Sequence, residues 1–328
     1  MGTPRAGIRC GGSGRDQSRN SVRTCDGTCD RARSARAQVG FDTGPVLSAL
    51  ARNMSCLGRK VGIVSKIGSD PLGRLALERL VDSGVEVHAV KVAVGRTTGL
   101  TVILPYPEHR FILTYPGTMF ELSYEDIDLD YICSARHFHM SSFFLHRGLR
   151  SHMLELFRTV KSAGLTTSLD TNDDPDDKWG RDVLEVLKYV DFFFPNEREA
   201  KKLMRTDDLA QATNTLAGLA KVVVVKRGPE AAVCEAGDKR WSLAPPAVQV
   251  VDPVGAGDSF SAGFIHQFLQ GADLEDCLAY ANLAGAYSCT REGGTEAFKD
   301  RRGTARFFRE YWADRGKAAA AVASGDMS

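Results

Sequence analysis

From about residue 59 onward, short runs rich in Val, Ile and Phe alternate with longer amphipathic stretches. Alternating strands and helices predict a mostly parallel sheet, because a parallel neighbour is reached through a crossover that lays a helix on the sheet. The run KVVVVK at 221–226 is apolar between its lysines, as expected of a strand buried on both faces. We therefore predict an α/β fold with helices on both faces of the sheet. Strands are expected at 60–66, 86–92, 100–105, 110–115, 135–140, 165–170, 190–194, 221–226, 231–235 and 247–251, and helices at 71–83, 147–163, 180–188, 197–204, 207–218, 257–270 and 273–290.

Residues 98–117 interrupt this alternation, because two strand-like runs follow each other with no helix between them. Such a hairpin in an α/β chain often forms a flap or lid, and a plain peripheral hairpin is the alternative. The chain shows no repeat and no linker, so we predict one domain over 41–315 with a small β lid at about 97–117. The low-complexity residues 316–328 are expected to form a flexible tail.

The first 40 residues differ from the rest of the chain. They hold eight Arg and three Asp but no Lys or Glu, so this segment carries +5 and the remainder carries −4. Only Ile8, Val22 and Val39 are branched aliphatics, too few to offset the ordering entropy of a folded segment. We interpret 1–40 as a disordered tail or as a wrong translation start. A transit peptide is less favoured, because no apolar face recurs at helical spacing.

The whole-chain composition excludes several classes of protein. Lys and Arg number 42 against 41 Asp and Glu, so no basic surface favours nucleic acid as a partner. No apolar run approaches the roughly 18–20 residues that span a bilayer, so no membrane partner is expected. The eight Cys are scattered and lack a second pair at zinc spacing, which indicates reduced thiols and a cytoplasmic location.

The most specific motif is VVDPVGAGDSFSAGFIHQFLQG at 250–271. A β-branched run ends at Asp252, and Gly255, Ala256 and Gly257 come just before a helical stretch. Glycines at a helix start let backbone N–H groups approach an anion, and the helix dipole adds about half a positive charge there. Asp258 falls in the first turn, where its carboxylate can accept a proton from a nearby hydroxyl. The string favours a cradle for a phosphoryl group, and a plain capped helix start is the alternative.

This segment closely resembles the C-terminal signature of the ribokinase-like (PfkB) carbohydrate kinases. The resemblance covers roughly residues 44–300 and includes further motifs in the family's order. These are FFPNEREA with Asn196 and Glu199, VVVVKRGPEAAV with Lys226 and Gly228, KIGSDPLG at 66–73, the hairpin at 97–117, SLDTN at 168–172 and ANLAGAYSCTREGG at 281–294. The resemblance implies the ribokinase-like three-layer α/β/α fold with a mostly parallel central sheet and a small β lid.

The resemblance also implies ATP- and Mg²⁺-dependent phosphoryl transfer to a hydroxyl of a sugar or sugar-like small molecule. In that reaction Asp258 is the general base, and the amides of Gly255, Ala256 and Gly257 form the anion hole. Asn196 and Glu199 are expected to organise Mg²⁺ through waters, because Mg²⁺ dehydrates reluctantly. A helix N-terminal acid is the alternative reading of Glu199.

The other roles implied by the resemblance concern the two substrates, a second cation and assembly. The nucleotide is expected at Lys226, Gly228 and Asn282, the acceptor at Gly44, Asn53, Asp170 and Asn172, and K⁺ at Asp252 with the loop near Gly293 and Gly294. Family members also suggest a homodimer through the lid.

The chain departs from the family pattern at its start. The family begins with a buried strand ending in Asn-x-Asp, and no such strand is evident in residues 1–40. The expected Gly-Gly aligns with Gly44 and Pro45, and a proline offers no amide N–H. The phosphate-transfer half therefore reads as complete and the sugar-recognition half as damaged. Two rival readings follow: a nucleoside kinase of the same fold, and a catalytically impaired or truncated homologue that binds a sugar or nucleotide.

Other motifs carry less weight. His137 and His139 alternate on a predicted strand and could form a metal pair, but no third ligand is evident, which favours a structural or substrate-side role. The chain has no Walker A sequence and no Gly-x-Ser-x-Gly elbow, so a P-loop kinase and a serine hydrolase are unsupported.

Overall fold

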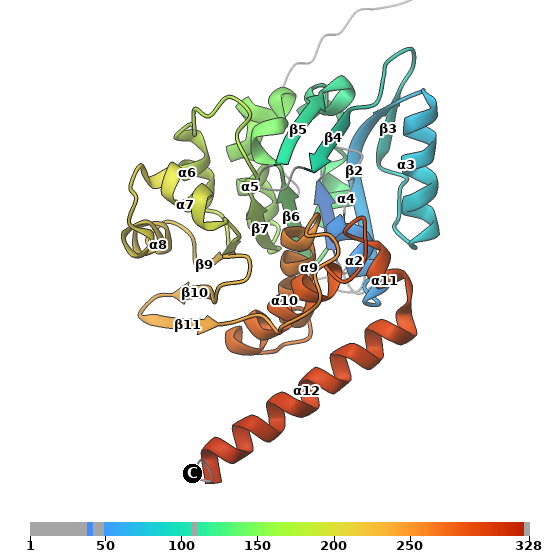
Figure 1. The fold of residues 1–328 in the computed structure, drawn as a ribbon. Coiled ribbons are helices and arrows are strands. Elements are labelled where there is room, and N and C mark those ends of the chain that lie inside the picture. The colour runs from blue at the N-terminus through green and yellow to red at the C-terminus, as the bar shows by residue number, and fades with distance from the viewer. Residues whose placement is uncertain (1–37, 42–48, 106–109, 325–328) are drawn as a thin grey trace, which may run out of the picture.

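The computed structural model of the chain describes residues 38–41, 49–105 and 110–324. One nine-stranded sheet runs through the molecule in the order β11-β10-β9-β8-β7-β6-β1-β2-β3, with helices on both faces (Figure 1). Its strands are β1 (Gln38–Phe41), β2 (Val61–Gly68), β3 (Val90–Ala93), β6 (His137–Ser141), β7 (Thr166–Asp170), β8 (Phe192–Phe193), β9 (Val222–Val225), β10 (Ala232–Ala236) and β11 (Lys239–Leu243).

The sheet is parallel from β3 to β9, and only the β10 and β11 pairings are antiparallel. All four valines of β9 are buried, as the sequence of this run predicts for a strand covered on both faces. The three-layer, mostly parallel fold is thereby confirmed.

The helices divide between the two faces of the sheet. Their apolar residues join two separate buried clusters, one on each side. One face carries α2 (Ala49–Cys56), α3 (Pro71–Asp82), α9 (Ala256–Phe268) and α10 (Leu274–Ser288); the other carries α4 (Leu129–Cys133), α5 (Met153–Ser162), α6 (Asp182–Leu187), α7 (Glu197–Met204) and α8 (Leu209–Ala217). The chain then continues through α11 (Glu296–Lys299) into α12 (Arg301–Ser324).

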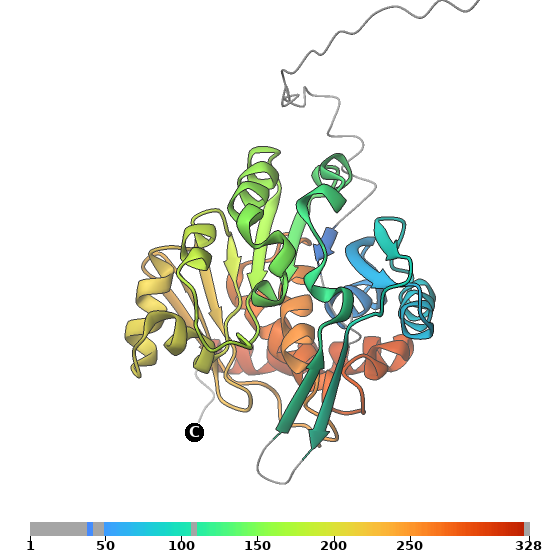
Figure 2. The same cartoon turned by 90° about the horizontal axis from the view of Figure 1, so that it is seen from above.

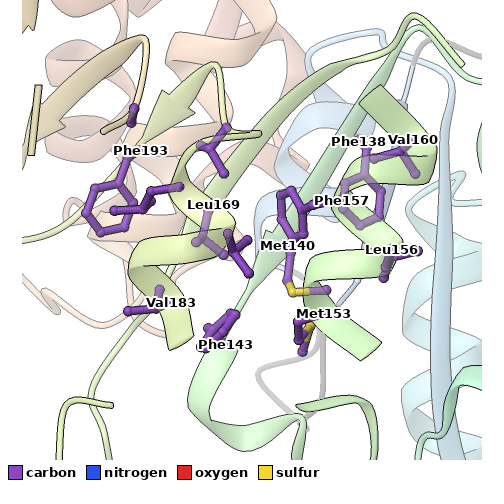
Figure 3. Close-up of a cluster of buried hydrophobic side chains, with 14 of the residues drawn as sticks. Phe138, Met140, Phe143, Met153, Leu156, Phe157, Val160, Leu169, Val183 and Phe193 are labelled. Carbon is purple, nitrogen blue, oxygen red and sulfur yellow. The ribbon is translucent and has the colours of Figure 1, made fainter. Parts of the chain in front are cut away.

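The cluster beneath α5 and α6 is rich in aromatic side chains (Figure 3). Phe138 on β6 meets Phe157 on α5 edge to face, with ring centroids 5.3 Å apart, and neither ring is exposed. Leu169 on β7 joins them from the next strand. This packing holds β6 and β7 in place, so the residues at their C-terminal ends are rigidly supported.

No first strand ending in Asn-x-Asp was found in residues 1–40; the structure does place a short strand at Gln38–Phe41, without that motif. Strand β1 begins at Gln38 and pairs in parallel with β2 on one side and β6 on the other. The four residues QVGF include a single β-branched side chain, so the local pattern is weak. This strand is defined by its pairing partners on both sides, and a local sequence pattern does not reveal those partners.

Two further expectations at the other edge of the sheet are corrected. The β-branched run at 247–251 forms no strand: Val250 and Val251 are more than half exposed, and the Val251 N–H bonds the Cys289 carbonyl. Strand β11 (KRWSL), which was not predicted, pairs with β10 after a turn in which Gly237 has φ of 57°. Charged residues are common on such edge strands, and a search for apolar runs therefore does not detect them.

The C-terminal region also differs from expectation. Residues 316–328 were expected to form a flexible tail, whereas α12 continues to Ser324. Its first turns pack on α10 through Phe307 and Phe308, which contact Tyr287. A run of alanines has the highest helix propensity, so low complexity here is compatible with helix.

The hairpin forms its own two-stranded sheet, β4 (Leu100–Pro105) with β5 (Arg110–Tyr115). It extends away from the body in Figure 2. The predicted strand positions are confirmed, and the hairpin lies outside the main sheet, as expected of a lid.

The sequence predicted reduced cysteines and no membrane-spanning segment, and the described residues bear on both predictions. The cysteines at 56, 133, 234, 277 and 289 are free thiols, and three of them are buried. Among the described helices, none combines the length and the apolar character that crossing a membrane requires.

Candidate active site

Three neighbouring strands bring polar side chains together at their C-terminal ends. Asp170 ends β7, Asn196 follows β8, and Lys226 follows β9, with a parallel bridge between Asn196 and Lys226. In open α/β sheets ligands bind outside the carboxyl ends of the strands, so the fold places these residues where a site is expected.

The central contact of this cluster is an ion pair. The Nζ of Lys226 lies 2.5 Å from Oδ2 of Asp170, and the two side chains are 11% and 1% exposed. Burial pulls the pKa of Lys226 down, but the carboxylates of Asp170, Glu199 and Asp258 outweigh it, so the pKa of the ammonium is raised. Lys226 is therefore charged at neutral pH and lies among three carboxylates.

Asn196 and Glu199 form the start of α7. The Asn196 side chain caps the helix by accepting from the Glu199 N–H at 2.9 Å, and the Glu199 carboxylate accepts from the Asn196 N–H at 2.9 Å. This reciprocal capping box satisfies two otherwise unpaired donors. Burial raises the pKa of Glu199 to about 7; Asp170 also raises it, while the positive charge of Lys226 opposes the shift.

The donor set around Glu199 suits a divalent cation. Carboxylate and amide oxygens are the ligands that Mg²⁺ prefers. A buried carboxyl with a pKa near 7 also gains from a cation that neutralises its charge. The residues predicted for Mg²⁺ therefore lie together and fit the group chemically.

The second part of the site is the start of α9. Gly255 precedes the helix with φ of 76°, and Gly294 has φ of 65°, both in the left-handed region that favours glycine. A Cβ at Gly255 would lie 2.9 Å from Cα of Gly294, so the two turns pack against each other without room for side chains. Asp252 joins them, accepting from the Val254 N–H and the Gly293 N–H, each at 2.9 Å.

Lys226 connects the two parts of the site. A Cβ at Gly257 would lie 3.5 Å from its Nζ, so the ammonium lies beside the glycine-rich helix start. Asp258 follows in the first turn of α9, half-buried and close enough to raise the pKa of Lys226. The Ala256 N–H bonds the Pro253 carbonyl at 3.3 Å. The structure thus brings together Gly255, Ala256, Gly257 and Asp258 with Lys226 and Asp170.

The other predicted site residues are distributed as follows. Asn53 on α2 is buried and donates to the Ser259 hydroxyl at 2.9 Å and to the Gly294 carbonyl at 3.4 Å. Asn172, in the left-handed region, donates to Ser142 across the ends of β7 and β6. Asn282 donates to the Leu243 carbonyl at 2.7 Å, Gly228 has φ of 58° in the turn after β9, and Gly44 lies outside the described residues.

Sequence reasoning missed two serines on the inner face of α9. The Ser259 hydroxyl contacts Asn53, and the Ser261 hydroxyl donates to Asp170 at 3.3 Å. Both are fully buried. The available signal was the string DSFSAGF itself, in which small polar residues occupy positions that a core-facing helix usually gives to apolar ones.

His137 and His139 form a buried hydrogen-bonded chain with Ser168. The Ser168 hydroxyl lies 2.8 Å from Nε2 of His137 and 2.7 Å from Nδ1 of His139, and Thr166 contacts the other side of His137. No group of three or more His, Cys, Asp or Glu side chains that could hold a metal ion occurs in the described part of the chain. The histidines are bonded to hydroxyl groups, in keeping with a structural role, which is one of the two roles that the sequence favoured.

Because His137 and His139 are buried, we expect the folded protein to lose stability in acid. Burial, together with the charge of His139, lowers the pKa of His137 to about 3, well below its ordinary value near 6.5. Between these values the unfolded chain binds more protons, so stability rises with pH and is lost on acidification. Replacing His137 by Gln should reduce the slope of unfolding free energy between pH 5 and 6 by about 1.4 kcal/mol per pH unit. Urea unfolding at both pH values measures the slope.

The matched control for this prediction is His88, whose side chain is 52% exposed. The change of slope should be larger in His137→Gln than in His88→Gln. An unchanged slope in His137→Gln would contradict the prediction.

The fold and this cluster define an α/β phosphotransferase, with a glycine-rich helix start, a carboxylate in its first turn and an ammonium beside both. The family model described as pfkB family carbohydrate kinase matches residues 24–301. The chain therefore belongs to the PfkB family of carbohydrate kinases.

Individual relatives agree with this assignment. A sugar kinase of Archaeoglobus fulgidus is 30% identical over 74% of this chain and 96% of its own length. The ATP-dependent ribose-1-phosphate kinase of Halopiger xanaduensis is 31% identical over 81% of this chain and 85% of its own length.

Solved structures show the same fold. The ribokinase II of E. coli in complex with ATP and Mg²⁺ aligns with a TM-score of 0.76 at 22% identity, covering 84% of this chain and 99% of that one. The adenosine kinase of Sinorhizobium meliloti aligns with a TM-score of 0.72 at 25% identity, covering 78% and 81%.

Proposed function

We propose that this chain transfers the γ-phosphoryl group of ATP to a hydroxyl of a sugar or sugar-like molecule. One observation carries the proposal: the Asp258 carboxylate, in the first turn of α9, and the Lys226 ammonium, beside Gly257, both lie at the glycine-rich start of α9, where the helix dipole favours an anion. A base, an ammonium and a helix N-terminus at one point supply what phosphoryl transfer requires.

In the proposed reaction the acceptor hydroxyl oxygen attacks the γ-phosphorus and the bond to the ADP oxygen breaks. The proton of the hydroxyl passes to the Asp258 carboxylate. Negative charge on the transferring oxygens is stabilised by N–H groups at the start of α9, including that of Gly257. Because these donors belong to a rigid helix, they need no reorganisation during the reaction.

We assign Mg²⁺ to Asn196 and Glu199. When bound, Mg²⁺ neutralises charge on the nucleotide phosphates. Glu199 is already held by the Asn196 N–H and buried beside Lys226, so its oxygens have a fixed direction. A monovalent cation beside Asp252, nucleotide contacts at Gly228 and Asn282, and a homodimer through the lid stay predictions.

For Lys226, which was predicted as a nucleotide-binding residue, we propose a more specific role. Its ammonium is held from behind by Asp170 and faces Gly257. We assign it to the phosphoryl oxygens, with Asp170 as the residue that positions it. Asp170 was predicted from the family resemblance as an acceptor ligand, and its contacts with Lys226 and Ser261 favour the positioning role.

The acceptor class is a sugar or a nucleoside. The likeness to an adenosine kinase and to a cytidine kinase of Thermococcus kodakarensis, 28% identical over 72% of this chain, supports the nucleoside alternative. The reading as a truncated homologue rested on an absent first strand, and the pairing of β1 with β2 and β6 argues against it.

The experiment that tests the function is ADP release from Mg-ATP by the purified chain. The acceptor panel should include sugars, sugar acids, sugar phosphates and nucleosides. Release that depends on one acceptor class supports the proposal and names the class. Binding of ATP without release for any acceptor would favour the catalytically silent homologue instead.

The lid is attached to the body through Thr98. Its hydroxyl donates to Oδ1 of Asp70 at 2.6 Å and accepts from the Gly68 N–H at 2.9 Å, and its own N–H donates to Oδ2 of Asp70. Asp70 in turn caps α3 by accepting from the Gly73 N–H. The orientation of β4 is thus set by a buried threonine at its base.

Replacing Thr98 by Val should loosen this attachment, because the isosteric side chain makes neither hydrogen bond. We expect the KM for the acceptor to rise severalfold and hydrolysis of ATP without acceptor to increase relative to transfer, since the lid excludes water. Steady-state assays with and without acceptor measure both. Thr101→Val, at an exposed pair on the hairpin itself, is the control and should behave as the wild type. Unchanged coupling in Thr98→Val would contradict the prediction.

A further inference from the structure

A small basic pocket lies beside α2. It is bounded by α2, the end of α3 and the α11–α12 junction, which approach one another in Figure 1. Its volume is about 200 Å³. The lining residues are Arg52, Cys56, Arg79, Asp82, Ser83, Lys299 and Arg301.

The pocket has an excess of positive charge. Four of its lining side chains are cationic and one, Asp82, is acidic. Glu296 lies nearby and pairs with Lys299 at 2.6 Å. Counting both carboxylates leaves a net charge of +2. In the described part of the chain, Arg79 and Arg301 have no carboxylate within ion-pair distance.

Arg52 is the buried member of the cluster. The residue is 8% exposed, and its Nε donates to the Ser83 hydroxyl at 3.0 Å. Its NH2 group lies 3.9 Å from Glu296, which is too long for a hydrogen bond. Burial and the neighbouring Arg79 lower the pKa of Arg52, with Glu296 opposing the shift, so the surroundings disfavour its charge. A guanidinium has five N–H donors, and an anion would engage those that Ser83 does not.

We propose that this pocket binds a small dianion of the phosphate type, either inorganic phosphate or the phosphoryl group of a small metabolite. The net charge of +2 matches a doubly charged anion. Arg52 is the buried lining residue and carries a planar guanidinium, which suits tetrahedral oxygens, and Arg79 and Arg301 are exposed lining residues. A volume of about 200 Å³ is sufficient for a phosphoryl group.

The pocket is distinct from the proposed catalytic site but connected to it. Asn53, next to Arg52 on α2, bonds Ser259 and the Gly294 carbonyl. Glu296 lies two residues beyond Gly294. An anion held here therefore contacts elements that also shape the start of α9.

The test is a calorimetric titration of the full chain with inorganic phosphate at low ionic strength and neutral pH. Removing two arginines by Arg79→Gln and Arg301→Gln together should weaken one binding event about tenfold or more, because charge-assisted hydrogen bonds are lost. Both residues are exposed, so the fold should tolerate the change. Phosphate should also raise the melting temperature of the wild type more than that of this variant.

The matched control is Arg74→Gln with Arg302→Gln. These arginines belong to the same two helices and carry the same charge, but they do not line the pocket. Their replacement should leave phosphate binding intact. If both double variants weaken phosphate binding equally, the effect comes from net charge alone and the proposal is wrong. The proposal is also wrong if neither double variant changes phosphate binding.

A second arm with a phosphomonoester such as glycerol phosphate identifies the source of the anion. Tighter binding of the ester than of phosphate, sensitive to Arg79 and Arg301, supports a metabolite phosphoryl group. Tighter binding of phosphate supports the free ion. Phosphate that binds at the start of α9 instead should still bind to the Arg79→Gln and Arg301→Gln double variant, which distinguishes the two sites.

Discussion

Replacing Asp258 by Asn is expected to lower kcat for phosphoryl transfer by about 100- to 10,000-fold, the usual contribution of a general base. The amide has nearly the same shape as the carboxylate but cannot accept the hydroxyl proton. Asp258 is half-buried in the first turn of α9, so the change should leave folding almost intact. The coupled ADP assay with the preferred acceptor measures kcat, and unfolding by urea measures stability.

Asp273→Asn is a suitable control for this experiment. Asp273 caps α10 by accepting from the Asp276 N–H at 2.9 Å, and Asn caps a helix about as well as Asp. This variant should retain wild-type turnover. Near-normal turnover in Asp258→Asn would remove Asp258 from the mechanism.

Regular alternation made most of the fold predictable. The helices α3, α7, α9 and α10 begin and end within a few residues of the expected positions, because each has a clear apolar face or a capping residue. The start of α9 was predictable for the same reason: the glycines, Ala256 and Asp258 are consecutive, so one short string contains the whole turn.

Strands whose definition depends on distant partners were not predictable. Strand β1 is four residues long with a single β-branched side chain, and it is defined by its pairing with β2 and β6. The run at 247–251 has the opposite property: β-branched residues favour a strand, but no strand pairs with it. Strand propensity reflects how well a residue packs against a neighbouring strand, and the sequence of one segment does not show which strand will be its neighbour.

The site shows the same limit. The ion pair between Lys226 and Asp170 joins residues 56 positions apart, and the contact of Ser261 with Asp170 spans 91. Each motif was visible separately. The order of β7, β8 and β9 in the sheet decides which motifs face each other, and it places Asp170, which was predicted as an acceptor ligand, beside Lys226.

The second large effect is expected on breaking that ion pair. Lys226→Met leaves the Asp170 carboxylate, 1% exposed, without its counter-ion. Removing one partner of a buried pair costs about 3–5 kcal/mol of unfolding free energy. Combining Lys226→Met with Asp170→Asn removes both charges, so most of that loss should be regained. Urea unfolding of the two single variants and the double variant measures the coupling.

Activity then separates the two roles of Asp170. If Asp170 positions Lys226, then Asp170→Asn should lower kcat, and the double variant should be stable but inactive. If Asp170 binds the acceptor instead, Asp170→Asn should raise the KM for the acceptor and leave kcat nearly unchanged. A double variant as unstable as Lys226→Met alone would show that the pair is not what supports this end of the sheet. A stable double variant with normal kcat would remove Lys226 from phosphoryl transfer, because its ammonium would then serve only to neutralise a buried carboxylate.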